Sequence, residues 1–483
     1  MWAGGEFMTQ SVKGKFKALQ QKLDGFYSAP IMAGIKKFVL SDKYAVSLFI
    51  LSSIFVVTGT EVFGTMLMAA IITFSIGLTN SVLPLFEGIL LTTCFTIRCK
   101  LSYDAFYSLW WMTIPIVIFL ILYLLRYPPR FKKGPLFGGI LATSVAVTLG
   151  GLGSISAKEY FSPTSLFYVF LLGFGMLIVY MFFCAEIEIE NEAEFAQRFS
   201  KMMCIVIAFL CVCLAEEYIS RYAEFAADPG ILAFQWRNNG STILMLAMPF
   251  PLYLSAKKFP YFFLSILAYL AILCTGSRGG MIFGFIELVI CFAVMLALDK
   301  HNRVKIAIVA AIGVACGIAL LPYLINMLSY TLGRLLAPGE NRIRLTLIGR
   351  GLKDFLSNPA FGKGIGYMGN NDIHNNAKFT LCWYHCSPVQ IIGSMGSVGV
   401  IAYIYLFSRR IKTFAKNLTF FGVVIFISYI GLELMSLVNP GIFSPFPYLV
   451  MATLYFVIIE KSSNEESRQT LKNVMNGTYW RGY

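Results

Sequence analysis

The sequence WYHCSPVQIIGSMGSVGVIAYIYLF, residues 383–407, has a polar first half and an apolar second half. Its second half is apolar and aromatic with small residues along one face, as in a membrane-spanning helix. Apolar runs of about 20 residues recur along almost the whole chain, without the ten-residue alternation of membrane β-strands. Over 483 residues the chain is 57% hydrophobic and 13% charged, about half the charge of a soluble protein. The sequence therefore predicts an all-α, polytopic transmembrane helix bundle.

Fourteen apolar segments can be delimited in the sequence. They cover 44–59, 63–79, 82–97, 106–126, 136–155, 165–185, 202–216, 239–255, 259–275, 281–298, 304–328, 388–407, 415–437 and 443–459. The first three are short and could be two spans with a re-entrant piece, so we expect 12–14 spans. The one sizeable extramembrane element is the loop 329–387, which we expect to carry amphipathic helices.

The distribution of Lys and Arg predicts the orientation, because cytoplasmic loops are enriched in these residues. With the N-terminus inside, the inner segments hold 26 of the 39 basic residues and the outer segments hold 13, of which 7 lie in the long loop. Long loops do not follow the rule, so the informative split is 26 to 6. Both termini are therefore expected in the cytoplasm and His385 outside. The same bias explains the net charge of +14 without a nucleic-acid partner.

This topology divides the chain into five regions. Residues 1–43 form a cytoplasmic segment. Its first seven residues look like a cloning scar before a natural start at Met8, and its mixture of Lys with apolar residues predicts a helix on the inner leaflet. The next two regions are the N-terminal transmembrane helices, 44–235, and the region with the candidate chemistry, 236–407. Residues 408–460 hold the last transmembrane helices, and 461–483 form a cytoplasmic tail.

Three places on the predicted outer side carry the candidate chemistry. The first is CTGSRGGMIFG, residues 274–284, where Arg278 lies in a turn between two apolar segments. Gly276, Gly279 and Gly280 allow a sharp turn and the close approach of a ligand. An arginine at the membrane boundary needs an anionic partner or a water-filled cavity. Snorkelling to lipid phosphate is the simpler alternative to a binding role.

The second place is ENRIRLTLIGRGLKDFLSNPAFGKGIGY, residues 340–367, which predicts an amphipathic helix along the outer membrane surface. Asn358-Pro359 should end this helix, and a turn with Gly362 and Gly364 follows. The predicted apolar stripe is Ile343, Leu345, Leu347, Ile348, Leu352, Phe355 and Leu356. Its polar neighbours are Arg342, Arg344, Arg350 and Lys353. A lid with solvated basic residues is the alternative interpretation.

The third place is His385, at the start of a predicted helix. That helix carries Gln390 and three glycines at three-residue intervals, Gly393, Gly396 and Gly399. Such spacing permits close helix packing. A neutral imidazole at the mouth of a cavity can take a proton from a hydroxyl. The alternative is a histidine that only caps or packs its helix.

The order and spacing of these motifs resemble the shared C-terminal region of the O-antigen ligase and Wzy-type polymerase superfamily. These are bacterial polytopic membrane glycosyltransferases of the C superfamily. Their pattern has Ser-Arg-Gly between two helices, an Arg opening an outer-loop helix, Pro-x-x-Gly-x-Gly, and a His whose helix carries Gln and spaced glycines. The resemblance covers about residues 236–407 and includes WRNNGSTILMLAMP near its start. Cys386 departs from the Asn that usually follows the family's His, and the HNN beginning at His374 makes that histidine a competitor.

The resemblance implies a metal-independent, inverting glycosyltransferase without a cofactor, in the bacterial inner membrane, with an active site that faces outward. The donor would be a glycan on undecaprenyl pyrophosphate. The acceptor would be a sugar hydroxyl of lipid A core, a surface glycan or a carrier-linked repeat. His385 would be the catalytic base, and Arg278 and Arg344, with Arg342 or Arg350, would bind the pyrophosphate through the planar guanidinium fork. Turn and packing support would come from Gly279, Gly280, Gly362, Gly364 and Gln390.

Other functions stay open at this point. A Wzy-type polymerase would use the same donor with a carrier-linked repeat as acceptor. A transporter or flippase for the same lipid would show related halves and paired charges at mid-membrane. Acidic residues in or near apolar segments keep that class open: Glu61, Glu87, Glu287 and Glu433. A peptidoglycan polymerase of the shape-and-division type is a third alternative, although its usual outer-loop acid is not evident.

The sequence does not favour a metal site. Cys382 and Cys386 flank His385, but only His374 would add a nearby nitrogen ligand for zinc. The outer-side carboxylates Glu216, Glu217, Glu224 and Asp228 are scattered along their segment. We therefore expect no metal.

Overall fold

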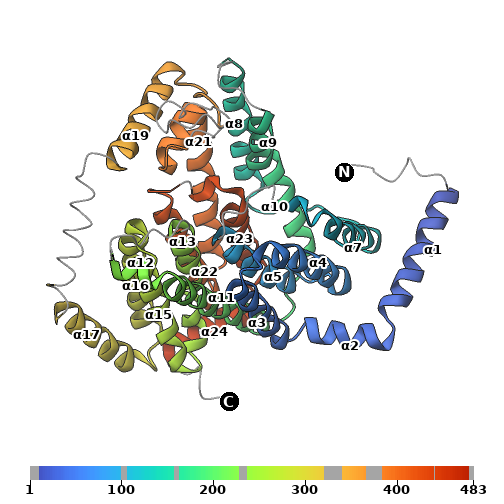
Figure 1. Cartoon of the computed structure of the whole chain (residues 1–483), viewed down its shortest axis with the longest axis horizontal. Coiled ribbons are helices and arrows are strands. Elements are labelled where there is room, and N and C mark those ends of the chain that lie inside the picture. Colours follow the sequence, from blue (N-terminus) through green and yellow to red (C-terminus); the bar gives the residue numbers. More distant parts are fainter. Residues whose placement is uncertain are drawn as a thin grey trace. The chain divides into compact units, whose positions relative to one another are not determined.

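The computed structural model describes residues 10–98, 106–156, 163–227, 237–319 with 322, 340–365, 383–439 and 441–477. Within these ranges every regular element is a helix (Figure 1). The contacts divide the chain into two compact units, Met1–Arg130 with Ala208–Ile231, and Phe131–Ile207 with Leu232–Tyr483. We call them unit 1 and unit 2 and describe each by itself. The helical class predicted from the sequence is confirmed.

Unit 1 is built from the N-terminal helices. They are α1 (Gln10–Tyr27), α2 (Pro30–Val39), α3 (Asp42–Thr58), α4 (Glu61–Thr79), α5 (Val82–Arg98), η1 (Trp110–Met112), α7 (Thr113–Arg126) and α12 (Tyr222–Ala227), with the end of α11 (Glu192–Ser220). The sequence stops two of these helices locally. Gly59 after α3 and Asn80 after α4 adopt the left-handed conformation that closes a helix end.

Unit 2 holds the remaining elements. They are α8 (Phe137–Ser156), α9 (Pro163–Phe170), η3 (Leu171–Gly175), α10 (Met176–Glu186), the start of α11, α13 (Arg237–Ala247), α14 (Phe250–Ser255), η5 (Phe259–Tyr261), α15 (Phe262–Cys274), α16 (Arg278–Leu298), α17 (Arg303–Ala319), α19 (Glu340–Ser357), α21 (Ser387–Lys416), α22 (Phe420–Met435), η6 (Gly441–Phe443), η7 (Pro445–Leu449), α23 (Val450–Lys461) and α24 (Glu465–Asn476). Across the two units, most predicted apolar segments coincide with a helix or with two or three consecutive helices.

Several helices are of membrane-spanning length. Among the described residues, five helices are long and apolar enough to cross a membrane: Glu61–Thr79, Leu166–Glu186, Glu192–Ser220, Arg278–Leu298 and Ser387–Lys416. The bent pair α2 and α3, at 76°, gives a sixth if it counts as one span. Shorter apolar helices cover further predicted segments: Val82–Thr96, Trp110–Arg126, Phe137–Gly150, Phe259–Cys274 and Phe420–Met435. The number of 12–14 spans stays a prediction.

Many large apolar side chains lie on the surface of these helices. On α17, Val304, Ile308, Ile312, Val314 and Ile318 are exposed, while Ile306 is buried. A soluble monomer rarely exposes apolar side chains in such continuous runs. The exposed surface therefore indicates association with lipid.

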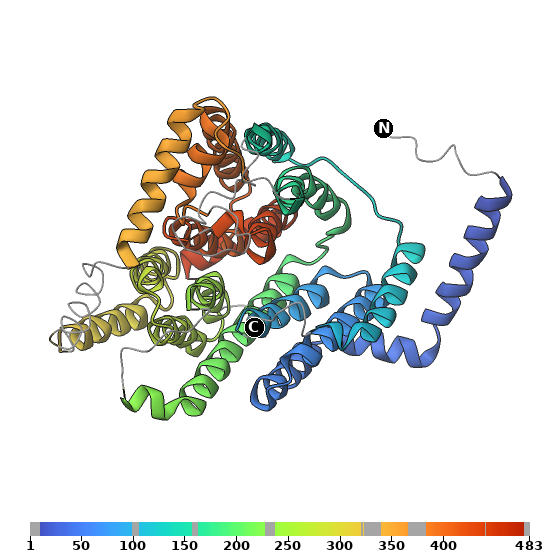
Figure 2. The same cartoon turned by 45° about the horizontal axis from the view of Figure 1, so that its top comes forward.

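The amphipathic helix predicted after Glu340 is present as α19, and it ends before Asn358-Pro359 as expected. Its predicted apolar stripe is wrong in part. Leu347 is fully buried, whereas Leu345, Leu352 and Leu356 are exposed. The buried face continues instead through Gly351 and Asp354, because α19 packs on α21 along residues spaced by three and four. Figure 2 shows α19, in amber, beside the orange α21.

Contacts at the two ends of unit 2 join different sets of helix termini. At one end, Ser277 Oγ donates to Asn238 Oδ1 (2.9 Å) and the Ser387 N–H donates to the Ser436 carbonyl (2.9 Å). At the other end, Arg409 Nε donates to the Pro135 carbonyl (3.1 Å). Two further contacts belong to this second end: the Lys132 N–H donates to the Met181 carbonyl and Arg468 Nη2 donates to the Lys416 carbonyl.

Candidate active site

A cavity of about 250 Å³ lies in unit 2 and includes His385 in its wall. Aromatic rings, carboxamides, a hydroxyl, a glycine and one imidazole line it: Tyr168, Asn239, Trp383, His385, Asn439, Gly441, Phe443, Ser444 and Tyr448. The Tyr168 and Trp383 rings meet edge to face with centroids 6.0 Å apart. Tyr448 Oη donates to Asn239 Oδ1 at 3.0 Å. The combination of aromatic walls, carboxamides, hydroxyls and one imidazole is suited to a polyhydroxylated, uncharged ligand.

His385 has an unusual backbone conformation. Its φ is +52°, in the left-handed region that favours glycine, and the described residues hold one other such non-glycine residue, Asn80. The side chain of His385 is half-buried. A non-glycine residue with positive φ is held there by its surroundings, and such strain often marks a functional site.

The helix after His385 is broken at Gly396, which has φ +59° and ψ −154°. A continuous helix would join the Ser397 N–H to the Gly393 carbonyl and the Val398 N–H to the Ser394 carbonyl. At this break all four groups bond to the turn after α19 instead. The turn provides the Lys363 and Gly364 N–H groups as donors and the Pro359 and Ala360 carbonyls as acceptors.

At this break, Gly396 and Gly362 leave no room for a side chain. A Cβ at Gly396 would lie 2.5 Å from the Ala360 carbonyl carbon, and one at Gly362 would lie 2.6 Å from the Gly393 carbonyl oxygen. Both glycines, and Gly364, also have positive φ. The Pro-x-x-Gly-x-Gly sequence thus serves as a backbone plug for the break in α21.

Gln390 does not line the cavity, and its side chain makes hydrogen bonds within its own segment. It is buried, its Oε1 accepts a hydrogen bond from the Tyr384 N–H (3.0 Å), and its Nε2 donates to Ser394 Oγ (2.8 Å). The side chain therefore holds the residue before His385 against the first turn of α21.

Arg278 begins α16 near the cavity. Its neighbour Ser277 caps the helix by accepting from the Gly280 N–H (3.2 Å), and the same hydroxyl bonds Asn238, the residue before Asn239 of the cavity wall. A Cβ at Gly279 would lie 2.6 Å from Val438 Cγ2, next to Asn439 of the wall. Both neighbours of Arg278 thus pack beside residues of the cavity.

The other arginines predicted to bind pyrophosphate, Arg342, Arg344 and Arg350, lie on α19. Arg342 and Arg344 lie in the first turns of α19, but their side chains are outside the described part of the chain. Arg350 Nε lies 3.6 Å from Asp354 Oδ1, so one of its contacts is internal to α19. His374 also lies outside the described residues, so the choice between His374 and His385 as the catalytic base stays a prediction.

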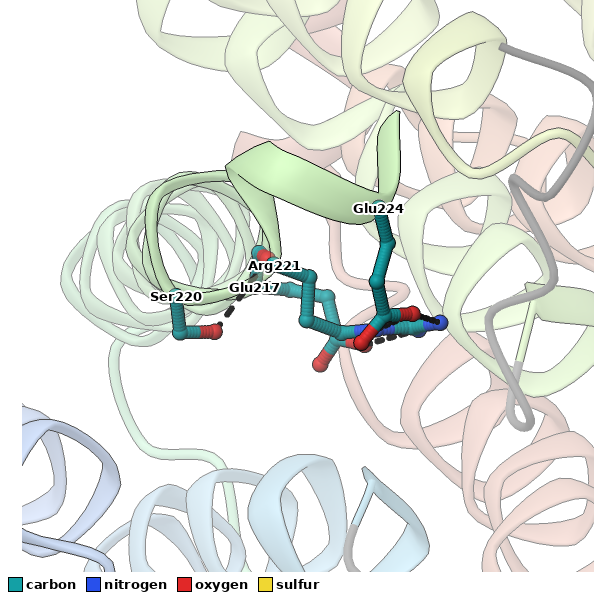
Figure 3. Close-up of polar contacts among 4 residues, drawn as sticks. All are labelled: Glu217, Ser220, Arg221 and Glu224. Carbon is teal, nitrogen blue, oxygen red and sulfur yellow. Dashed lines mark hydrogen bonds and ion pairs between the residues drawn. The ribbon is translucent and has the colours of Figure 1, made fainter. Parts of the chain in front are cut away.

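Two of the four carboxylates considered as metal ligands, Glu217 at the end of α11 and Glu224 on α12, bind an arginine of the same unit. Asp228 lies outside the described residues. Arg221 Nη1 donates to Glu217 Oε1 (2.8 Å) and Arg221 Nη2 donates to Glu224 Oε2 (2.6 Å), as Figure 3 shows. The hydrogen bonds from Arg221 lower the pKa of Glu224. Within the described ranges no group of three or more His, Cys, Asp or Glu gathers in a metal-binding arrangement.

No family model, curated protein or solved structure matches this chain. Evidence for function therefore comes from the order of the sequence motifs and from the geometry of the cavity.

Several residues of the cavity were not singled out from the sequence. Asn239 lies in the WRNNGST stretch that contributed to the resemblance, so its position offered a signal. Asn439, Ser444 and Tyr448 come from the segment after α22 and carry no motif. Their role follows only from the fold, which brings the ends of distant helices together.

Proposed function

We propose that this chain is a glycosyltransferase that moves a glycan from an undecaprenyl-pyrophosphate carrier to an acceptor sugar hydroxyl on the outer face of the bacterial inner membrane. The observation that carries the proposal is the cavity in which His385 lies among sugar-compatible groups. The residues next to its wall, Asn238 and Val438, contact the start of α16, where Arg278 lies. The motif order that resembles the O-antigen ligase superfamily supports it independently.

The reaction assigns one task to each part of the site. His385 takes the proton of the acceptor hydroxyl while the acceptor oxygen bonds to the anomeric carbon. The bond from that carbon to the pyrophosphate oxygen breaks, and its electron pair leaves with the pyrophosphate. Attack opposite the leaving group inverts the configuration. Arg278 offsets the charge that develops on the pyrophosphate, with Arg344 as the second candidate.

The grouping of helix ends supports the proposed topology. The cavity is formed by Tyr168 of α9, the start of α13, the loop before α21 and the segment after α22. The charge bias assigns the chain near all of these to the outer side. The contacts Arg409–Pro135 and Lys132–Met181 join ends assigned to the cytoplasm. In unit 1, Arg126 binds Asp24 and the Gly77 carbonyl, which are again ends assigned to the cytoplasm.

A lipid transporter is the second candidate, and one observation favours it. Glu287 on α16 is fully buried, and neither carboxylate oxygen has a hydrogen-bond partner among the described residues. Ionisable groups at such positions in membrane helices are commonly functional. A Wzy-type polymerase remains the alternative within the same chemistry.

The deciding experiment is transfer of a defined lipid-linked oligosaccharide by the purified chain in nanodiscs, with products sized by mass spectrometry. We expect free undecaprenyl pyrophosphate and an acceptor enlarged by the whole glycan. Carrier-linked products that grow by one repeat would identify a polymerase. Movement of unaltered donor across vesicle membranes without any transfer would contradict the proposal and support the transporter.

A further inference from the structure

The conformation of His385 is fixed by the residues on both sides of it. After it, the Cys386 carbonyl accepts a hydrogen bond from the Gln390 N–H (2.8 Å) and the Ser387 N–H donates to the Ser436 carbonyl (2.9 Å). Before it stands Tyr384, which is buried. His385 is thus a single strained residue between two fixed neighbours, and it cannot relax to negative φ unless one of them moves.

Tyr384 is fixed at three points. Its N–H donates to Gln390 Oε1, and its Oη donates to Asp354 Oδ2 on α19 at 2.7 Å. The ring fills the space left by two glycines, since a Cβ at Gly393 would lie 2.7 Å from Tyr384 Cε2 and one at Gly351 would lie 3.2 Å from Cδ1. The tyrosine therefore links the outer-loop helix α19 to the first turns of α21.

Asp354 is the residue of α19 that accepts the hydrogen bond from the Tyr384 hydroxyl. The residue is 5% exposed although it carries a carboxylate, and it also lies 3.6 Å from Arg350. A buried carboxylate is retained at a cost unless its hydrogen bonds are met, and a hydroxyl donor at 2.7 Å meets one of them. Loss of the tyrosine hydroxyl would leave this carboxylate underbonded and would free the ring to shift.

We propose that Tyr384 and Asp354 are positioning residues that hold the His385 imidazole toward the cavity, so that docking of α19 sets the geometry of the base. This inference rests on the proposed function for its kinetic consequence. Its structural part, that the Tyr384–Asp354 bond maintains the conformation of the His385 segment, stands by itself and can be measured without turnover.

The kinetic test compares Tyr384→Phe with a matched control, Tyr180→Phe. Tyr180 is also buried with a bonded hydroxyl, which accepts from the Leu136 N–H at the other end of unit 2 (2.9 Å). A small misplacement of a catalytic group costs up to about a hundredfold in rate. We expect Tyr384→Phe to lower kcat about 10- to 100-fold with KM for the lipid-linked donor unchanged, and Tyr180→Phe to keep kcat near wild type. Equal kcat values for the two variants would overturn the proposal.

A conservative rescue separates positioning from general destabilisation. In Asp354→Asn the amide oxygen can still accept from Tyr384, so kcat should stay within about threefold of wild type. In Asp354→Leu no acceptor remains, and kcat should fall as in Tyr384→Phe. If Asp354→Asn is as impaired as Asp354→Leu, hydrogen bonding to Tyr384 is not what positions the base.

Cys386 provides a readout that does not need turnover. This half-buried thiol directly follows His385, and its alkylation by a maleimide can be followed by mass spectrometry of its peptide. We expect several-fold faster alkylation in Tyr384→Phe and in Asp354→Leu, but not in Tyr180→Phe. An unchanged rate in the first two variants would refute the structural part. A change in rate in a protein without transferase activity would uphold that part and reject the proposed function alone.

Discussion

Arg278 shows how one side chain can be assigned a task from its position. Arg278 is the first residue of α16, and in the proposed reaction it binds the donor pyrophosphate. Its neighbours Ser277 and Gly279 contact Asn238 and Val438, each of which is next in sequence to a residue of the cavity wall. A guanidinium binds a pyrophosphate through two parallel N–H bonds, which an ammonium group cannot reproduce.

Arg278→Lys should therefore fail to restore transfer even though it keeps the charge. Loss of a contact that strengthens in the transition state costs about 2–4 kcal/mol, or about a hundredfold in rate. The measurement is initial rate with a saturating acceptor in reconstituted membranes. A Lys variant with wild-type rate would show that Arg278 only contacts lipid phosphate.

The sequence allowed candidate site residues to be predicted, but not their backbone conformations or hydrogen-bond partners. His385 and Gln390 were singled out from their helix register. The positive φ of His385 and the Tyr384–Asp354 bond were not, because both depend on α19 and α21 lying together. Asp354 in particular lies within a stretch whose predicted apolar stripe did not include it.

At the scale of elements, the break in α21 is the main feature. Gly396 adopts backbone angles that are almost confined to glycine, and the turn 359–364 supplies the hydrogen bonds that the break removes from the helix. Each part depends on the other, so the break and the plug should be lost together.

Gly396→Ala should destabilise the protein by about 1–3 kcal/mol, because it adds a Cβ against Ala360 and strains a positive φ. The matched control is Gly313→Ala on α17, where a Cβ would meet nothing within 4 Å and helix propensity improves. Thermal unfolding in detergent would compare the two variants. Equal midpoints would mean that the break at Gly396 is not maintained in solution.

Docking of α19 should also depend on pH. Burial raises the pKa of Asp354 above its ordinary value of 3.8, against opposing effects of Tyr384, Arg350 and Lys363. The native carboxyl therefore keeps its proton to higher pH than the unfolded one, so its contribution to the free energy of unfolding falls as pH rises above about 4.

Asp354→Asn removes this dependence. The melting temperature of the variant relative to wild type should increase from pH 4 to pH 7, and differential scanning fluorimetry can measure it. A difference that stays constant, or that declines, would contradict the raised pKa.

The sequence predicted most elements well and their interruptions poorly. Apolar runs located the helices, since side chains that face lipid or a core must be apolar whatever the tertiary structure. The break at Gly396 was interpreted as close packing, because a glycine suits both. A break differs from close packing because the turn 359–364 supplies the missing hydrogen bonds, and this turn lies more than 30 residues from Gly396 in the sequence.

For the protein as a whole, the proposed reaction requires that the cavity open to the side of the membrane where a flipped lipid-linked donor would lie. The charge split and the grouping of helix ends agree on which ends lie together, but only the charge split assigns a side. The motif order suggested the chemistry, whereas the acceptor cannot follow from motifs because ligases and polymerases share the donor reaction.

Cysteine labelling in spheroplasts tests this orientation. With accessible native cysteines replaced by serine, Lys363→Cys should react with a membrane-impermeant maleimide, and Lys412→Cys should react only after the membrane is opened. The reverse pattern would invert the topology and remove the cavity from the outer face.

The proposed role of His385 as the base of a glycosyl transfer can be tested by comparing His385→Ala with His374→Ala. Both purified variants would be assayed for binding of the lipid-linked donor and for its transfer. Removal of a general base costs about 10²–10⁴ in rate and leaves substrate binding largely intact. We predict that His385→Ala binds the donor without transferring it, while His374→Ala turns over nearly normally. Normal turnover by His385→Ala would contradict the account, and a dead His374→Ala beside it would assign the base to His374.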